Sequence, residues 1–184
     1  MKINLYAFRA IYLHEMDRFR RTLTQSVLSP VLTTSLYFIV FGSVIGGYVE
    51  KIDGISYGSY IVPGLLMLTL LTQSISNTSF GIFFPKFNGT IYEILAAPIS
   101  TLEVVLAFVG AGATKTLIVS IIIFITSLFF VDVQVKYPLL MIFLLILVAF
   151  TFALFGFLIG LMSSDFEQMS IIPTLFVTPM VFLG

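Results

Sequence analysis

Long uncharged stretches dominate the chain and alternate with short segments that carry its charges. A helix needs about 20 mostly apolar residues to span the hydrocarbon core of a bilayer. The pattern therefore predicts an all-α polytopic membrane protein in which residues 1–184 form a single transmembrane domain. The expected membrane segments are spans at about 27–47, 57–83, 104–131 and 137–164, followed at 168–184 by the start of a fifth span.

The first 21 residues follow a different pattern, because their apolar residues recur at helical spacing. The apolar positions are Leu5, Phe8, Tyr12, Met16 and Phe19. The opposite face carries His14, Asp17, Arg18 and Arg21. Such a stripe, running directly into a membrane span, predicts an amphipathic helix over 1–21 that lies in the membrane interface. The alternative is a fully solvated helical extension.

The last segment, 168–184, contains Pro173 and Pro179, which interrupt the helical pattern. It is expected to be a broken or re-entrant helix, or else the beginning of a span in a C-terminally truncated chain. The sequence favours truncation, because no polar flank follows the apolar run.

Basic residues set the expected orientation, since cytoplasmic segments of membrane proteins are enriched in Lys and Arg. The segment before the first span and the loop after the second span hold Lys2, Arg9, Arg18, Arg20, Arg21 and Lys86. The loops after the first and third spans hold only Lys51 and Lys136. The N-terminus is therefore expected in the cytoplasm, with the protein multi-pass in a plasma membrane, the bacterial inner membrane being favoured.

Composition narrows the function classes. Hydrophobic residues make up 59% of the chain and charged residues 10%, against roughly 25% charged residues in soluble domains. The net charge is zero, which argues against nucleic-acid binding, because phosphate neutralisation needs a basic surface. With no Cys and only His14, the sequence predicts neither a metal site nor catalytic residues.

The loop from Lys86 to Glu103 contains two patterns typical of capping boxes, Thr90-x-x-Glu93 and Ser100-x-x-Glu103. Pro98 forces a break between them. The loop therefore predicts a short amphipathic helix at about 91–97 on the cytoplasmic side. Its apolar residues Ile91, Ile94 and Leu95 are expected to cluster. The helix could be a docking site for a cytoplasmic partner or a simple interfacial reversal of the chain.

Several residues stand out inside the apolar runs. Lys115 is the only ionisable residue deep in a span, and it could snorkel, pair structurally or line a substrate path. The second span itself carries a polar stripe at helical spacing, formed by Thr69, Gln73, Ser76 and Asn77. Either interhelical hydrogen bonds or a substrate path would explain it. Two small-residue pairs predict helix packing or a dimer seam: Gly42 with Gly46 and Gly156 with Gly160.

These features together resemble the integral-membrane permease of ABC exporters of the type-2 family, which includes polysaccharide, lipo-oligosaccharide and drug exporters. The resemblance rests on the Arg-rich N-terminal segment, a first span with Pro30 and Phe41-Gly42, the run Gly89–Ser100, and the run Pro179–Gly184. The family normally has six spans, so the resemblance implies a sixth span that this sequence is expected to lack. Phe84–Asn88 also stands where members often carry an acidic–basic pair.

The resemblance implies a permease subunit that forms the substrate pathway and couples to a separate cytoplasmic ATPase subunit. ATP and magnesium would then bind that partner, so this chain is expected to hold no cofactor and to be no enzyme by itself. A second copy or a related permease would complete the pathway in the lipid bilayer. The implied coupling residues are Thr90, Ile91, Tyr92, Glu93, Ile94, Leu95 and Pro98. An ion-coupled secondary transporter and an intramembrane enzyme remain as alternatives, although neither has clustered acidic residues here.

Overall fold

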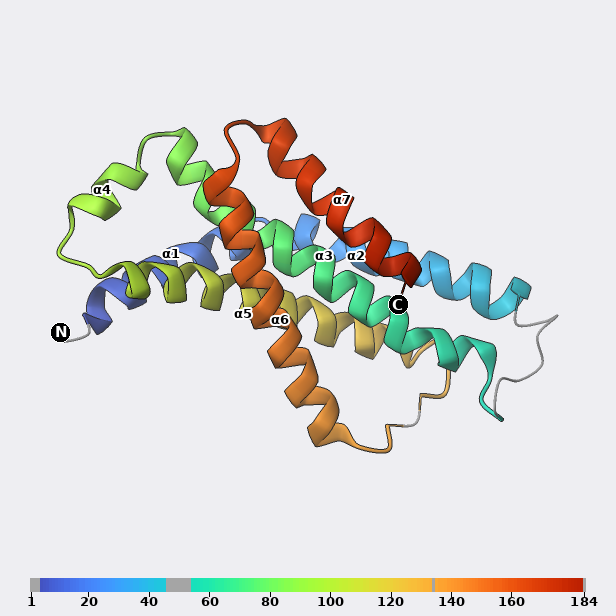
Figure 1. Cartoon of the computed structure of the whole chain (residues 1–184). Helices are drawn as coiled ribbons and strands as arrows, with labels where there is room; N and C mark the ends of the chain where they lie inside the picture. The colour runs from blue at the N-terminus through green and yellow to red at the C-terminus, as the bar shows by residue number, and fades with distance from the viewer. Residues whose placement is uncertain (1–3, 46–53, 134, 184) are drawn as a thin grey trace.

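The computed structural model describes residues 4–45, 54–133 and 135–183, and every regular element in these ranges is a helix (Figure 1). Four helical segments are long and apolar enough to cross a membrane, which confirms the predicted all-α polytopic class. The elements are α1 (Leu5–Arg21), α2 (Leu23–Tyr37), the π-helix η1 (Phe38–Ile45), α3 (Tyr57–Phe87), α4 (Ile91–Ala96), α5 (Thr101–Ser127), α6 (Pro138–Met162) and α7 (Phe166–Leu183).

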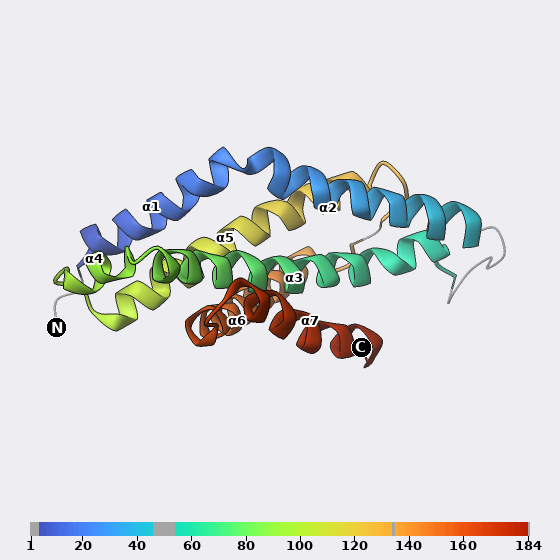
Figure 2. The ribbon, with the colours of Figure 1, turned by 90° about the horizontal axis from the view of Figure 1, so that it is seen from above.

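The helices form three layers (Figure 2). One outer layer contains α1 and α2, the middle contains α3 and α5, and the other outer layer contains α6 and α7. In Figure 1, α6 crosses the middle layer obliquely, and α7 then runs back along α3. The middle helices are therefore covered on both sides, whereas much of α6 and α7 is open to the surroundings.

Two hydrogen bonds show which loops share an end of the bundle. The backbone N–H of Asn4 donates to Glu103 Oε1 at 2.7 Å, so the start of α1 lies beside the start of α5. The turn between α6 and α7 lies at this same end, which we call the α4 end. At the opposite end, the Ser59 hydroxyl donates to the carbonyl of Asp132 at 3.0 Å. The loops thus alternate between the two ends, as expected of successive spans.

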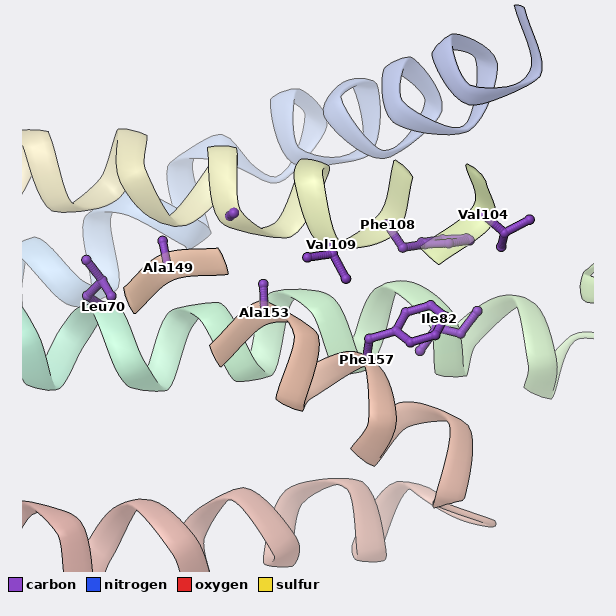
Figure 3. Packing of buried hydrophobic residues seen from close by; sticks show 9 residues of the cluster. Leu70, Ile82, Val104, Phe108, Val109, Ala149, Ala153 and Phe157 are labelled. Carbon is purple, nitrogen blue, oxygen red and sulfur yellow. The ribbon is translucent and has the colours of Figure 1, made fainter. Parts of the chain in front are cut away.

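Small residues on α6 allow it to contact α3 backbone to backbone. Ala149 and Ala153 are fully buried, and Figure 3 shows them beside Leu70 on α3 and the neighbouring core side chains. A Cβ added at Gly156 would lie 2.5 Å from the Ile75 carbonyl oxygen, and one at Gly160 would meet the α3 backbone just as closely. Both glycines therefore lie at a helix–helix contact within the chain.

The first glycine pair is only partly described. Gly42 belongs to η1, whereas Gly46 lies outside the described residues, as does the loop around Lys51. The first span itself begins earlier than predicted, at Leu23, and continues through Pro30 as a helix. Its far end changes to a π-helix at Phe38, which the apolar pattern did not reveal.

The proline-containing segment α7 is one continuous helix from Phe166 to Leu183, so the alternative of a helix broken at Pro173 and Pro179 is wrong. Membrane helices tolerate proline because nearby hydroxyl side chains and neighbouring helices compensate for the lost backbone bond.

The N-terminal helix α1 packs on α5. Phe19 is buried, and the Tyr12 hydroxyl donates to Thr114 Oγ1 on α5 at 3.0 Å. A fully solvated extension is therefore wrong. The interfacial interpretation assigned the apolar stripe to lipid, but the stripe lies partly against protein, with Leu5 still exposed at its start.

Candidate functional site

The short helix α4 lies at one end of the bundle, between α3 and α5. It covers Ile91–Ala96, close to the predicted 91–97. Gly89 precedes it with φ +80°, a conformation that side chains with a Cβ rarely adopt. Pro98 follows the helix and is exposed. A tight glycine turn and a proline therefore bound α4 on its two sides.

The predicted capping box at the start of α4 is wrong. Thr90 has φ −66° and ψ −13°, and its side chain makes no cap hydrogen bond. A capping side chain needs a non-helical backbone to reach the N–H three residues on. With helical dihedral angles, the Thr90 hydroxyl instead lies 3.4 Å from the Pro85 carbonyl oxygen, and Glu93 is left exposed.

The second capping box forms as predicted at the start of α5. The Ser100 N–H donates to Glu103 Oε2 at 2.9 Å, and the Glu103 N–H donates to the Ser100 hydroxyl oxygen at 3.4 Å. The other carboxylate oxygen of Glu103 accepts the hydrogen bond from Asn4. One carboxylate therefore fixes the start of α5 and also attaches α1 to it.

The apolar residues of α4 divide into two faces, which corrects the expectation of one cluster. Ile91 and Ile94 pack against the main hydrophobic core. Leu95 points the other way, with 66% of its surface exposed, and Tyr92 is 72% exposed. The inner face therefore anchors the helix, and the outer face presents an aromatic ring and a leucine.

Lys115 pairs with a residue of α1 that the sequence pattern had not singled out. Lys115 Nζ lies 2.7 Å from Glu15 Oε2, and both side chains are 3% exposed. Arg18 binds the same oxygen at 2.8 Å, and its guanidinium carbon lies 5.5 Å from the centre of the Phe80 ring. The structure places Lys115 in a buried ionic cluster that joins α1 to α5.

Two grooves flank α3. The groove between α3 and α7, here the α7 groove, encloses about 480 Å³ and is lined by Leu68, Thr72, Ser76, Ser79, Phe80, Met169, Ser170, Pro173, Thr174, Val177 and Thr178. The groove between α2 and α3, here the α2 groove, encloses about 280 Å³ and is lined by Ser29, Pro30, Thr33, Thr34, Tyr37, Leu65, Leu68, Thr69, Thr72 and Gln73. They share Leu68 and Thr72, so they form one continuous face.

The polar stripe of the second span opens onto these grooves. Thr69 and Gln73 line the α2 groove, and Ser76 lines the α7 groove. Asn77 is half-buried, and its amide donates to Gln73 Oε1 at 3.3 Å. In the described ranges, the hydrogen bonds of these side chains stay within α3, so interhelical bonding does not account for the stripe.

Comparison with known proteins now identifies the family. The model of the ABC-2 type transporter family matches residues 6–184. The chain belongs to this family. It is similar to the inner membrane transport permease YadH of Escherichia coli strain K12, with 37% identity over 184 residues that cover the whole chain and 72% of that protein. It is also similar to nodulation protein J of Azorhizobium caulinodans, with 20% identity over 185 residues that cover the whole chain and 73% of that protein.

No solved structure matches this ABC-2 permease. The family assignment makes the chain the membrane permease subunit of an ABC transporter and a multi-pass inner membrane protein. Permeases of this family work with an ATPase partner. The alternative of an ion-coupled secondary transporter therefore falls away.

Sequence reasoning missed the hydroxyl groups that face α3 across each groove of the permease. On α7 these are Ser170, Thr174 and Thr178, and on α2 they are Ser29 and Thr33. Both sets repeat every four residues, which is the same signal that revealed the stripe on α3. Among the residues that the structure covers, no group of three or more His, Cys, Asp or Glu side chains could hold a metal ion.

Proposed function

We propose that α4 is the docking helix for the ATPase subunit, and that Tyr92 and Leu95 enter an apolar groove on that subunit. The observation that carries the proposal is the division of α4 into an anchored inner face and an apolar outer face. An isolated helix of six residues is unstable in water, so α4 depends on its packing against the core. Anchored in this way, it can move with the bundle as a rigid protrusion.

The length of α3 supports an aqueous position for α4. Its 31 residues span about 46 Å at 1.5 Å per residue, whereas the hydrocarbon core is about 30 Å thick. This length leaves about 16 Å to be divided between the two ends of α3 outside the hydrocarbon core, so the α4 end can extend beyond it. Lys86, in the last turn of α3, favours the cytoplasm for the α4 end, because basic residues are enriched there.

We further propose that the two grooves line the substrate pathway. Some of the hydroxyl groups that line the grooves, such as those of Thr69 and Thr174, donate to carbonyls of their own helix. A face that gathers hydroxyl and amide groups from α2, α3 and α7 is nevertheless better suited to another protein surface or a water-filled path than to lipid tails. One permease supplies only one side of the substrate pathway, and a second copy or a related permease would supply the other side. Apolar and hydroxyl-bearing walls suit amphiphilic substrates, such as lipid-linked glycans or drugs.

In this proposal ATP and magnesium bind the partner subunit, and the permease itself holds no cofactor and catalyses no reaction. Closure of the ATP-binding subunits moves α4, and the bundle transmits that motion to the grooves. The permease thus uses ATP binding and hydrolysis on its partner to change which side of the membrane the substrate pathway opens to.

The docking role is tested with Leu95→Asp. A charge in an apolar contact costs more than 1.4 kcal/mol, so the affinity for the ATPase subunit should fall at least about tenfold. The measurement is the amount of ATP-binding cassette subunit that co-purifies with tagged permease, together with substrate-stimulated ATP hydrolysis in nanodiscs. Leu95→Met, which keeps the apolar volume, should bind as the wild type does.

A second control separates docking from folding. Leu128→Asp adds the same charge at the opposite end of the bundle, where the leucine is 49% exposed, and should retain the ATPase subunit. Wild-type co-purification and stimulation by Leu95→Asp would show that α4 is a simple reversal of the chain at the membrane surface.

A further inference from the structure

Lys86 joins two parts of the permease that are far apart in sequence. Its ammonium group donates to the carbonyl of Leu161 at 2.7 Å and to the carbonyl of Ser163 at 2.8 Å. These carbonyls lie at the C-terminal end of α6, where the last turn of a helix leaves its carbonyls without backbone partners. A lysine there satisfies those acceptors and also interacts favourably with the helix dipole.

The corner that Lys86 holds is itself well ordered by hydrogen bonds. Asp165 Oδ1 accepts from the N–H of Gln168 at 2.7 Å, and Gln168 Oε1 accepts from the N–H of Ser164 at 3.1 Å. Ser163 is fully buried, and its hydroxyl donates to the carbonyl of Ile159 at 2.8 Å. Any displacement of the corner therefore moves the start of α7.

Aromatic packing makes a second attachment between the same two elements. The Phe166 ring, at the first position of α7, lies edge-on to Phe83 and Phe87 of α3, with ring centres 4.9 Å and 4.8 Å away. Lys86 lies between these two phenylalanines in sequence. The final turn of α3 therefore holds α7 by one ring and the end of α6 by one ammonium group.

Lys86 is also close to α4. The N–H of Gly89 donates to the Lys86 carbonyl at 3.3 Å, in the turn that leads into α4. Resting on the proposed docking role of α4, we infer that Lys86 is a positioning residue for transport. It fixes the α6–α7 corner to the turn that carries α4, so a displacement of α4 reaches α7, the outer wall of the α7 groove.

The test measures how accessible α7 is within the α7 groove. Thr174→Cys places a thiol in the α7 groove, and its rate of modification is compared with and without ATP in nanodiscs that contain the permease and its ATPase subunit. In the otherwise wild-type permease, ATP should change this rate. With Lys86→Met, the ATP-dependent change should shrink at least about fivefold, the lower range of coupling between sites. Lys86→Arg keeps the charge and the donors, and should retain the change.

The controls separate this inference from the docking role. Lys136→Met removes a lysine at the opposite end of the bundle, beside Tyr137, and should leave the response intact. Lys86→Met should still co-purify the ATPase subunit, because Tyr92 and Leu95 are unchanged. If Lys86→Met does not insert, the shorter neutral variant Lys86→Gln takes its place.

Each outcome of this experiment tests either the positioning role of Lys86 or the docking role of α4. A full ATP response in Lys86→Met or Lys86→Gln would overturn the positioning role and leave docking intact. A loss of response in Lys86→Arg equal to that in Lys86→Met would overturn it as well, since carbonyl capping would then not be the cause. Failure of wild-type permease to bind the ATPase subunit would instead overturn the docking role.

Discussion

In the buried ionic cluster, replacing Glu15 and replacing Lys115 should cost the permease different amounts of stability. Glu15 is the shared carboxylate, because Lys115 and Arg18 both bind its Oε2 atom, at 2.7 Å and 2.8 Å. Glu15→Gln would leave Lys115 buried and without a counterion. Lys115→Met would leave Glu15 paired with Arg18. The first change should therefore destabilise the permease more than the second.

The contacts of each side chain set the expected loss in the free energy of unfolding. Removing one partner of a buried ion pair costs about 3–5 kcal/mol, which is the expectation for Glu15→Gln. Lys115→Met loses one charge-assisted hydrogen bond, worth about 1.5–3 kcal/mol, and regains part of this through apolar packing. The double variant Glu15→Gln with Lys115→Met should be more stable than Glu15→Gln alone, because no buried amine then lacks a partner.

Thermal unfolding of the permease in nanodiscs measures these differences. For chains of 150–250 residues, 1 kcal/mol shifts Tm by about 2–4 °C, so Glu15→Gln should lower Tm by roughly 6–20 °C. Arg18→Gln, which leaves the buried pair intact, is the matched control and should have the smallest effect. Equal losses for Glu15→Gln and Lys115→Met, or a double variant less stable than either, would refute the shared-carboxylate reasoning.

Three further predictions concern packing, capping and orientation. Gly156→Ala should destabilise the permease by about 1–3 kcal/mol in thermal unfolding, because the added Cβ meets the α3 backbone, whereas Gly64→Ala, with nothing within 4 Å, should be neutral or stabilising. Ser100→Ala should cost about 1 kcal/mol in the same assay, and no loss would show that this cap is dispensable. In intact cells, Val135→Cys should react with an impermeant thiol reagent and Asn88→Cys should not, whereas the reverse pattern would invert the topology.

The apolar runs predicted most of the fold, because a bilayer requires long helices whose backbone bonds are satisfied internally. Short local motifs predicted the structure less consistently. The same four-residue pattern formed a capping box at Ser100, where the backbone is extended with ψ 150°, and failed at Thr90, where it is helical with ψ −13°. Sequence spacing does not encode that backbone difference, which depends on the preceding glycine turn.

The sequence pattern could not predict contacts between residues that are far apart along the chain. Lys115 and Glu15 are separated by 100 residues, and only the packing of α1 on α5 brings them together. Lys86 likewise reaches a helix end 77 residues away. The division of α4 into two faces also depends on the core beneath Ile91 and Ile94, and a six-residue segment shows too little periodicity to reveal it.

The central claim, that the outer face of α4 contacts the ATPase subunit, is tested most directly by site-specific photo-crosslinking. A photoreactive residue replaces Leu95 in the permease, and a second variant carries it at Leu139 of α6, which is 83% exposed at the other end of the bundle. The account predicts a crosslink to the ATP-binding cassette subunit from position 95 and none from position 139. Absence of a crosslink at 95 in an assembled, ATP-hydrolysing complex would contradict it.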